Sequence, residues 1–153
     1  RILINPNHAD EVIVGVIGHL YSSNTERGIF KTTDGGKTWT KSLFINQDTG
    51  IIDVAVAPEN FNIMYAASWE RERKAWNFEG NGNNSSIYKS TDAGTTWTKI
   101  ADNAGFPTGN GVGRIVLMKI RFMLCMIVNL EDHKTQIKSP QKVYLKKILR
   151  QCL

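Results

Sequence analysis

Two segments of the chain carry the same ordered set of side chains that can form hydrogen bonds around a turn. Each fits the pattern Ser/Thr-x-Asp-x-Gly-x-Thr-Trp, and the second begins 58 residues after the first. We call residues 32–39 the first box and residues 90–97 the second box. The pattern fixes five positions in each box: Thr32, Asp34, Gly36, Thr38 and Trp39 in the first, and Ser90, Asp92, Gly94, Thr96 and Trp97 in the second.

The Asp of each box suits a turn better than a reaction. Its carboxylate can accept hydrogen bonds from backbone N–H groups two residues on, and the hydroxyl of the preceding Ser or Thr can join them. The Gly permits a backbone turn with positive φ, and the Trp is large enough to anchor the outgoing strand in a core. We therefore interpret Asp34 and Asp92 as structural residues with no part in catalysis.

Other carboxylates could in principle do acid–base chemistry. A glycosidase needs two carboxylates about 5–10 Å apart, and no second acid has a spacing that pairs it with Asp53. We favour a role for Asp53 at the start of an inner strand. The acids in predicted loops offer no better pair: Asp48, Glu70, Glu72 and Glu79. The three histidines, His8, His19 and His133, lack the spacing of metal ligands, so we expect no metal and no cofactor.

Aromatic and arginine residues cluster in sequence around the longest loop of the second repeat. The candidate ligand-binding residues are Trp69, Arg71, Arg73, Trp76 and Phe78. Such side chains suit stacking on carbohydrate or anchoring of a protein partner. The alternative is structural: Trp69 would pack between sheets, and Arg71 and Arg73 would pair with nearby acids.

The elements that must position these residues are short strands in a repeated series. Apolar strands are predicted at 2–5 and 12–18 before the first box, and at 51–57 and 63–69 before the second. Each box then contributes two more strands as a hairpin, which gives the four strands of a propeller blade. Six extra residues in the second repeat fall within 70–84, and insertions on one face of a repeat protein often mark its binding face.

The boxes resemble the Asp-boxes, or BNR repeats, of sialidases, sortilin-like Vps10 proteins and family 74 xyloglucanases. In those families the box is the hairpin between the third and fourth strands of a β-propeller blade, on the face away from the ligand site. The resemblance implies an all-β chain, a fragment of a β-propeller with about two four-stranded blades. We expect blades at 1–49 and 50–112, and the start of a third within 113–153.

Three further segments, at 49–58, 65–71 and 105–115, resemble large secreted bacterial propellers of the sortilin-like or glycosyl-hydrolase-like BNR group. This implies an extracellular or periplasmic protein that binds a protein, peptide or carbohydrate ligand. The alternative is part of a glycoside hydrolase resembling family 74. Loop 70–84 is expected on the face opposite the boxes, together with 46–50 and 107–114. The chain opens inside an expected strand, so we expect a longer product.

The formal charge of +5 is concentrated at one end of the chain. Residues 1–115 hold 11 Lys and Arg against 12 Asp and Glu, whereas residues 116–153 hold 8 against 2. A basic tail could contact nucleic acid or an anionic membrane, but it lacks interleaved aromatic residues. Its apolar run is too short and too charged for a membrane span. We therefore expect no nucleic acid and no membrane insertion.

All the glycines and tryptophans precede residue 116, and both cysteines follow it. One interpretation of this change is a basic helical tail, because residues 143–150 have roughly helical spacing. The other is a shifted reading frame. Read from the third base, the codons of residues 118–126 can encode Glu-Asn-Thr-Val-Tyr-Ala-Val-His-Asp, which resembles residues 62–67. We favour the frame shift, and expect a non-propeller tail of helix or disordered coil from about residue 116.

Overall fold

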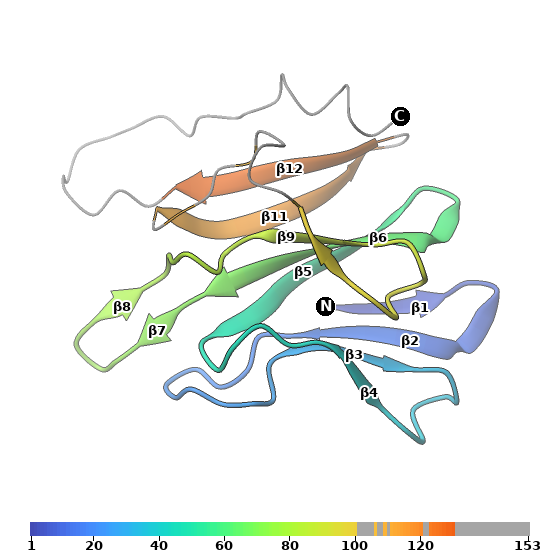
Figure 1. Cartoon of the computed structure of the whole chain (residues 1–153), viewed down its shortest axis with the longest axis horizontal. Coiled ribbons are helices and arrows are strands. Elements are labelled where there is room, and N and C mark those ends of the chain that lie inside the picture. The colour runs from blue at the N-terminus through green and yellow to red at the C-terminus, as the bar shows by residue number, and fades with distance from the viewer. Residues whose placement is uncertain (101–105, 107–108, 110, 121–122, 131–153) are drawn as a thin grey trace.

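The computed structural model describes residues 1–100, 106, 109, 111–120 and 123–130. Within these residues every regular element is a β-strand, and the strands form antiparallel sheets (Figure 1). The all-β class, which the resemblance implies and the predicted series of short strands supports, is therefore confirmed.

The first sheet, sheet A, is formed by the first repeat. It contains β1 (Ile2–Asn5), β2 (His8–Val16), β3 (Gly28–Thr32) and β4 (Thr40–Leu43), in the order β1-β2-β3-β4. Asn5 pairs with His8 across a tight turn, so β2 starts earlier than the predicted strand at 12–18. The first box forms the connection between β3 and β4, as its hairpin pattern predicts.

The second sheet, sheet B, repeats this topology. It contains β5 (Thr49–Ala57), β6 (Asn60–Glu70), β9 (Ile87–Ser90) and β10 (Thr98–Lys99), in the order β5-β6-β9-β10. The longer loop between β6 and β9 forms a separate small hairpin of β7 (Glu72–Arg73) and β8 (Phe78–Glu79). The extra residues of the second repeat therefore form a separate hairpin and add no strand to sheet B.

The change to helix or coil expected at residue 116 is wrong for the described part of the tail. β11 (Val112–Ile120) pairs with β12 (Met123–Leu130) as an antiparallel two-stranded sheet. Ile115 and Leu117 of β11 are buried against sheet B, which favours continuing the strand past residue 116. Residues 131–153, including the segment 143–150 with helical spacing, lie outside the described residues.

The main core lies between sheets A and B. Ile13 and Ile29 of sheet A meet Ile51, Val54 and Met64 of sheet B, and all five are buried. Gly15 lies at this contact, where a Cβ would stand 2.8 Å from Cγ2 of Val54. The absence of a side chain at Gly15 thus lets β2 approach β5 closely.

A second core lies on the other face of sheet B. Ala67 and Ile87 pack there against Val112, Ile115 and Leu117 of the third sheet. Because side chains alternate along a strand, β6 supplies both cores. Sheet A, sheet B and the β11–β12 sheet form successive layers, with sheet B in the middle (Figure 1).

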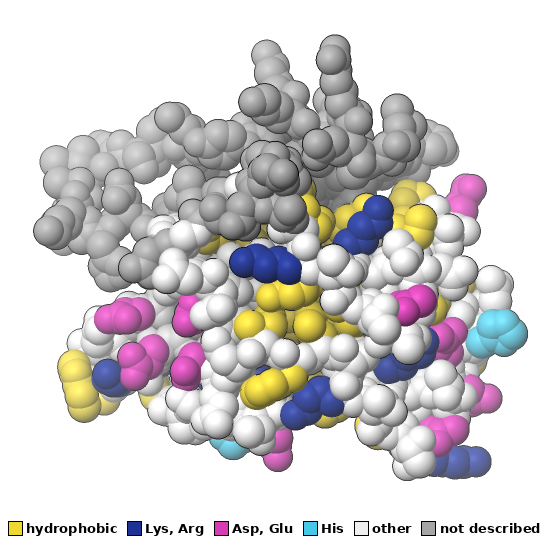
Figure 2. Space-filling view, viewed as in Figure 1, with side chains coloured by type: hydrophobic (Ala, Val, Ile, Leu, Met, Phe, Trp, Pro, Cys, Tyr) yellow, Lys and Arg dark blue, Asp and Glu magenta, His cyan; other side chains and the backbone are white. Residues whose placement is uncertain are grey.

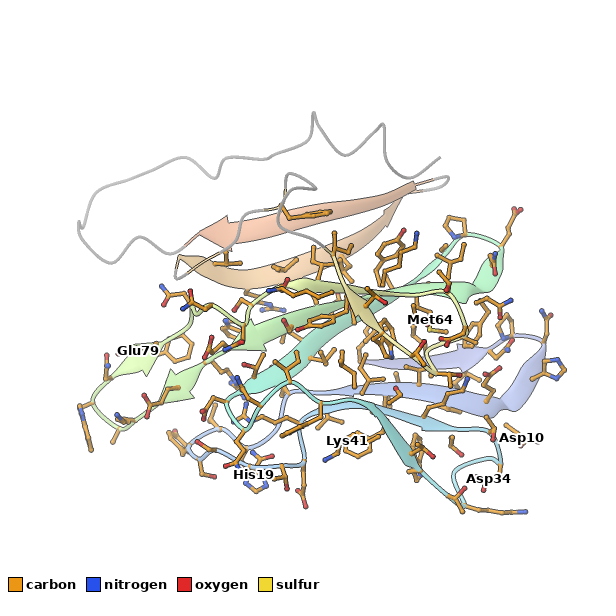
Figure 3. All side chains as sticks on the ribbon, in the orientation of Figure 1. Asp10, His19, Asp34, Lys41, Met64 and Glu79 are labelled. Atoms are coloured by element: carbon orange, nitrogen blue, oxygen red, sulfur yellow. The ribbon has the colours of Figure 1, made fainter. Side chains whose placement is uncertain are left out.

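The connections lie at the two opposite ends of the strands, which we call the box edge and the loop edge. The box edge carries both boxes; Gly35 N–H of the first donates to Asp10 O at 3.0 Å, and Ala93 N–H of the second donates to Asn62 O at 3.0 Å. The loop edge carries segments 17–27, 44–48 and 71–86. Asp34 and Asp10 lie at one end of the view in Figure 3, and Glu79 lies at the other. In Figure 2 hydrophobic side chains show over the middle, together with some Lys and Arg side chains, and most acidic side chains lie toward the left and right.

Candidate functional site

Each box carboxylate is surrounded by donors from its own turn. Asp34 accepts hydrogen bonds from the Thr38 N–H at 2.9 Å, the Thr38 hydroxyl at 2.6 Å and the Thr32 hydroxyl at 2.7 Å. The Thr32 oxygen in turn accepts from the Gly36 N–H at 3.0 Å, and Gly36 has φ of 91°. The side chains that the pattern fixes thus close a ring of hydrogen bonds, in which each carboxylate oxygen of Asp34 accepts at least one.

The second box repeats this geometry. Asp92 accepts from the Thr96 hydroxyl at 2.6 Å, the Thr96 N–H at 2.9 Å and the Ser90 hydroxyl at 2.8 Å. The same donors, with the Thr96 hydroxyl contributing most, hold the pKa of Asp92 at about 2. The Thr38 hydroxyl and N–H do the same for Asp34, whose pKa is also about 2. Hydrogen bonds to the charged form explain both shifts.

The second box also contacts the neighbouring sheet. Lys31 of β3 donates to Ala93 O at 2.8 Å and to the Thr95 hydroxyl oxygen at 3.0 Å. The Trp97 indole N–H donates to Ser42 Oγ of β4 at 3.2 Å. Within the described structure, the Trp39 indole of the first box bonds only to Gly36 O of its own turn, and Trp39 is 45% exposed. A box therefore serves as a contact between sheets as well as a turn.

Asp53 links successive inner strands. Its carboxylate accepts from the Leu117 N–H of β11 at 3.1 Å and from the Val54 N–H at 3.0 Å, and it lies 3.5 Å from the Arg1 guanidinium before β1. These contacts hold β5 between its two neighbours. They support the structural role that the sequence favoured for Asp53 over a catalytic one.

The loop edge brings four of the five predicted ligand-binding residues together. The rings of Trp69 and Phe78 meet edge to face, with centroids 6.1 Å apart. The Arg71 guanidinium lies 5.5 Å from the Trp69 ring centre, and the Arg73 guanidinium lies 5.5 Å from that of Phe78. Trp76 stands apart from this group at the tip of the β7–β8 hairpin, with 84% of its surface exposed.

The acids near these arginines have other partners. Glu72 pairs with Lys74 at 3.1 Å, and Glu70 accepts from the Asn84 backbone N–H at 2.9 Å. Among the described residues no carboxylate forms an ion pair with Arg71 or Arg73, and the buried Nε of Arg71 has no hydrogen-bond partner. The structural alternative, in which these two arginines pair with nearby acids, is therefore wrong for the described residues.

A polar hollow of about 180 Å³ opens beside the arginines. Three connections line it, with Leu20, Tyr21, Ser22, Ser23 and Arg27 from the first, Asp48 from the second, and Arg71, Glu72 and Arg73 from the third. The connections are held to one another by bonds from Asn24 N–H to Gln47 O and from Arg71 N–H to Asp48 O. The hollow thus spans the boundary between sheets A and B.

Arg27 forms the support of this hollow. Only 2% of its surface is exposed, and its guanidinium donates to the backbone oxygens of Ile17 at 2.7 Å, Ser22 at 3.0 Å and His19 at 3.1 Å. These bonds fix the loop that carries Tyr21. The Nε of Arg27 is buried without a partner in the described structure.

Burial and mutual repulsion disfavour the positive charges of the guanidinium groups in the hollow. Burial lowers the pKa of Arg27, the charge of Arg71 lowers it further, and Asp48 opposes the shift. Burial also lowers the pKa of Arg71, and Arg73 adds to the effect. The guanidinium groups nonetheless stay protonated, because the unperturbed pKa of arginine is so high. The hollow is therefore a site of incompletely compensated positive charge.

Sequence reasoning missed Tyr21 and Arg27, and it considered Asp48 only as a catalytic acid. No repeat signal could have indicated Arg27, because the equivalent position in the second repeat, 58 residues on, is Ser85. Arg27 and Ser85 are both buried, each with 2% exposure, but they support different loops. The contact between segments 17–27 and 71–73 depends on how the sheets stack.

The described part of the chain shows neither of two further classes of site. No group of three or more His, Cys, Asp or Glu side chains there is arranged to hold a metal ion. Nor do those residues include a helix long and apolar enough to cross a membrane.

Comparison with solved structures supports the fold. An ancestral GH74 enzyme matches with a TM-score of 0.50 and 19% sequence identity, over 76% of this chain. Sheets A and B are β-propeller blades. At this identity the likeness shows the fold alone, and the chain spans only 14% of the length of that enzyme. No family model matches the chain, and no curated protein matches it in sequence.

Proposed function

We propose that this chain is part of an extracellular or periplasmic BNR propeller of the sortilin-like group, and that its loop edge binds a protein, peptide or glycan ligand. The observation that carries the proposal is the hairpin β7–β8, which the second blade adds beside the hollow. It carries an exposed Trp76, and at its start lie Arg71 and Arg73, which pair with no carboxylate among the described residues. Exposed aromatic and arginine side chains beside a hollow are typical of binding surfaces.

The position of the hairpin supports this proposal. The boxes, whose polar groups are satisfied within their own turns, occupy the opposite edge. The hairpin belongs to neither four-stranded sheet, so its sequence can vary at little cost to the blades. Such loops on a rigid scaffold are common sites of ligand binding.

The test compares Trp76→Ala with the parent chain on arrays of oligosaccharides and peptides. We expect ligand signal to fall with Trp76→Ala while the melting temperature stays unchanged, since Trp76 is 84% exposed. Trp39→Ala, which removes an exposed tryptophan on the box edge, is the matched control and should bind as the parent does. A large fall in melting temperature with unchanged binding would assign Trp76 to the core and contradict the proposal.

The second candidate is part of a glycoside hydrolase, and the likeness to the GH74 propeller favours it. Catalysis by this route requires two carboxylates facing the scissile bond, and Asp53 is occupied by its contacts to Leu117 and Val54. The catalytic acids would then lie partly or wholly outside this chain. Release of reducing sugar from xyloglucan by the protein would support this candidate, and binding without hydrolysis would favour the first.

A further inference from the structure

We propose that the hollow on the loop edge binds a carboxylate of an acidic oligosaccharide, with Arg71 and Arg73 as the residues that recognise it. This inference rests on the proposed function, and narrows the ligand of that same surface to an anionic carbohydrate. Three features carry it: uncompensated positive charge, pre-positioned guanidinium groups, and exposed aromatic residues in the lining (Tyr21) and at the tip of the neighbouring hairpin (Trp76).

The charges around the hollow do not cancel locally. Its lining contains Arg27, Arg71 and Arg73 against Asp48 and Glu72. Glu72 is paired with Lys74 at 3.1 Å, so its charge is shared with a fourth cation. The Asp48 carboxylate accepts from the Ser23 hydroxyl and forms no ion pair in the described structure. An anion in the hollow would relieve the repulsion among the guanidinium groups.

The two recognising arginines are held without using their donors. Arg71 lies over the Trp69 ring and Arg73 over the Phe78 ring, and these two rings support each other. In the described structure neither guanidinium donates a hydrogen bond. A planar guanidinium that is already positioned can bind a carboxylate through two parallel bonds, and little side-chain freedom remains to be lost.

The surroundings favour a carbohydrate over a peptide as the carrier of that carboxylate. Tyr21 in the lining is 66% exposed, and Trp76 at the tip of the β7–β8 hairpin is 84% exposed, so both have aromatic surface available to sugar rings. A peptide bound by strand addition needs a free strand edge. Of the strands at the hollow, β7 and β8 have two residues each and offer too short an edge, and β5, an edge strand of sheet B, only begins beside it at Thr49.

The experiment measures binding of tetragalacturonic acid to the full chain at low ionic strength by titration calorimetry. Its fully methyl-esterified form is the matched ligand, because it keeps the sugar rings and removes the charge. We expect the acid to bind and the ester to bind at least about tenfold more weakly. Arg71→Met should weaken binding of the acid by at least about tenfold. Lys37→Met, which removes one positive charge from the box edge, should change it by less than about twofold.

Arg73→Met serves as a second variant, because Arg73 is exposed and its loss should leave folding intact if Arg71→Met does not fold. Equal binding of the acid and the ester would overturn the carboxylate inference but leave a glycan-binding face. Binding of the ester without binding of the acid would have the same consequence. Binding of a poly-glutamate peptide with the same sensitivity to Arg71→Met would overturn the carbohydrate assignment. An equal loss with Lys37→Met would show attraction to net charge only.

Discussion

At the scale of single residues, the two boxes show how both oxygens of a carboxylate can be hydrogen-bonded within a turn while remaining near solvent. Asp92 is bound by hydroxyl and N–H donors from its own turn, and these donors need the charged carboxylate as their acceptor. The resulting fall in pKa ties the stability of the turn to the ionisation of the Asp. Residue-level predictions for the boxes therefore concern stability and its dependence on pH.

Replacing Asp92 with Ala should destabilise the chain by on the order of 1 kcal/mol, since water can partly replace the lost acceptor at this exposed turn. Asp34→Ala should cost less, because among the described residues the first box has no counterpart of the contacts that the second box makes to a neighbouring sheet through Trp97 and Lys31. Urea unfolding of both variants measures the difference. An Asp92→Ala protein as stable as the parent would contradict the structural role.

The pKa values of about 2 for Asp34 and Asp92 predict a loss of stability in acid. Because folding lowers these pKa values, the stabilisation is complete above the unfolded value near pH 4 and is lost as pH falls toward about 2. The double variant Asp34→Asn and Asp92→Asn should therefore have a shallower fall in unfolding midpoint across this window. A slope equal to that of the parent would show that other carboxylates control acid unfolding.

At the scale of elements, the contact between sheets A and B combines an apolar core with a polar clamp. Lys31 on β3 binds Glu11 of its own sheet at 2.8 Å, and it also reaches the second box. Lys89 is the counterpart of Lys31, 58 residues on, and lies 5.8 Å from the centre of the Tyr65 ring. The same repeat position thus links two sheets through Lys31 in the first repeat, and Lys89 makes no such link among the described residues in the second.

Lys31→Met should destabilise the chain by about 2–3 kcal/mol, because it leaves Glu11 without its cation and Ala93 O without its donor. Lys89→Met is the matched control. It removes the same charge from the equivalent position, where no described residue accepts a hydrogen bond from it. Thermal or urea unfolding of the pair gives the comparison, and equal losses would show that the clamp contributes nothing.

At the scale of the whole molecule, the outer face of sheet A exposes apolar residues whose counterparts in sheet B pack in the main core. Val54 and Val56 of β5 pack in the main core, and their counterparts 52 residues earlier, Ile2 and Ile4, are 64% and 59% exposed. Trp97 packs in the same core, whereas Trp39 is 45% exposed. This face has the composition of a blade interface, and exposed apolar patches favour association.

We therefore expect the isolated chain to self-associate through sheet A. Ile4→Lys should increase the monomer fraction in sedimentation velocity, because it places a charge in the patch. Lys37→Glu, a charge change on the box edge away from this patch, is the control and should leave association unchanged. A monodisperse parent chain at the same concentration would contradict the expectation.

The frame-shift hypothesis for the tail is tested by the gene. Genomic DNA read across codons 116–126 should show an inserted or deleted base relative to a frame that encodes Glu-Asn-Thr-Val-Tyr-Ala. A single uninterrupted frame, together with strong hydrogen-exchange protection through residues 116–153, would favour an evolved tail. The strands β11 and β12 occupy the first part of this region.

Local interactions explain what the sequence by itself determined. The strands, the hairpins at the boxes and the structural role of Asp34 and Asp92 all depend on residues within a few positions of one another. Alternation of apolar residues and fixed turn chemistry specify them directly. The repeat offset extended this to the blade, because one four-stranded unit is built twice from neighbouring segments.

Only the tertiary structure decided the composition of the hollow and the role of Asp53. Arg27 and Arg71 approach each other because sheets A and B stack, and no local pattern reports the distance between loops of different blades. Asp53 finds its partner Leu117, 64 positions later, by the same stacking. Strand β11 likewise passes the predicted boundary at 116 because burial of Leu117 against sheet B outweighs the change in composition that the sequence shows there.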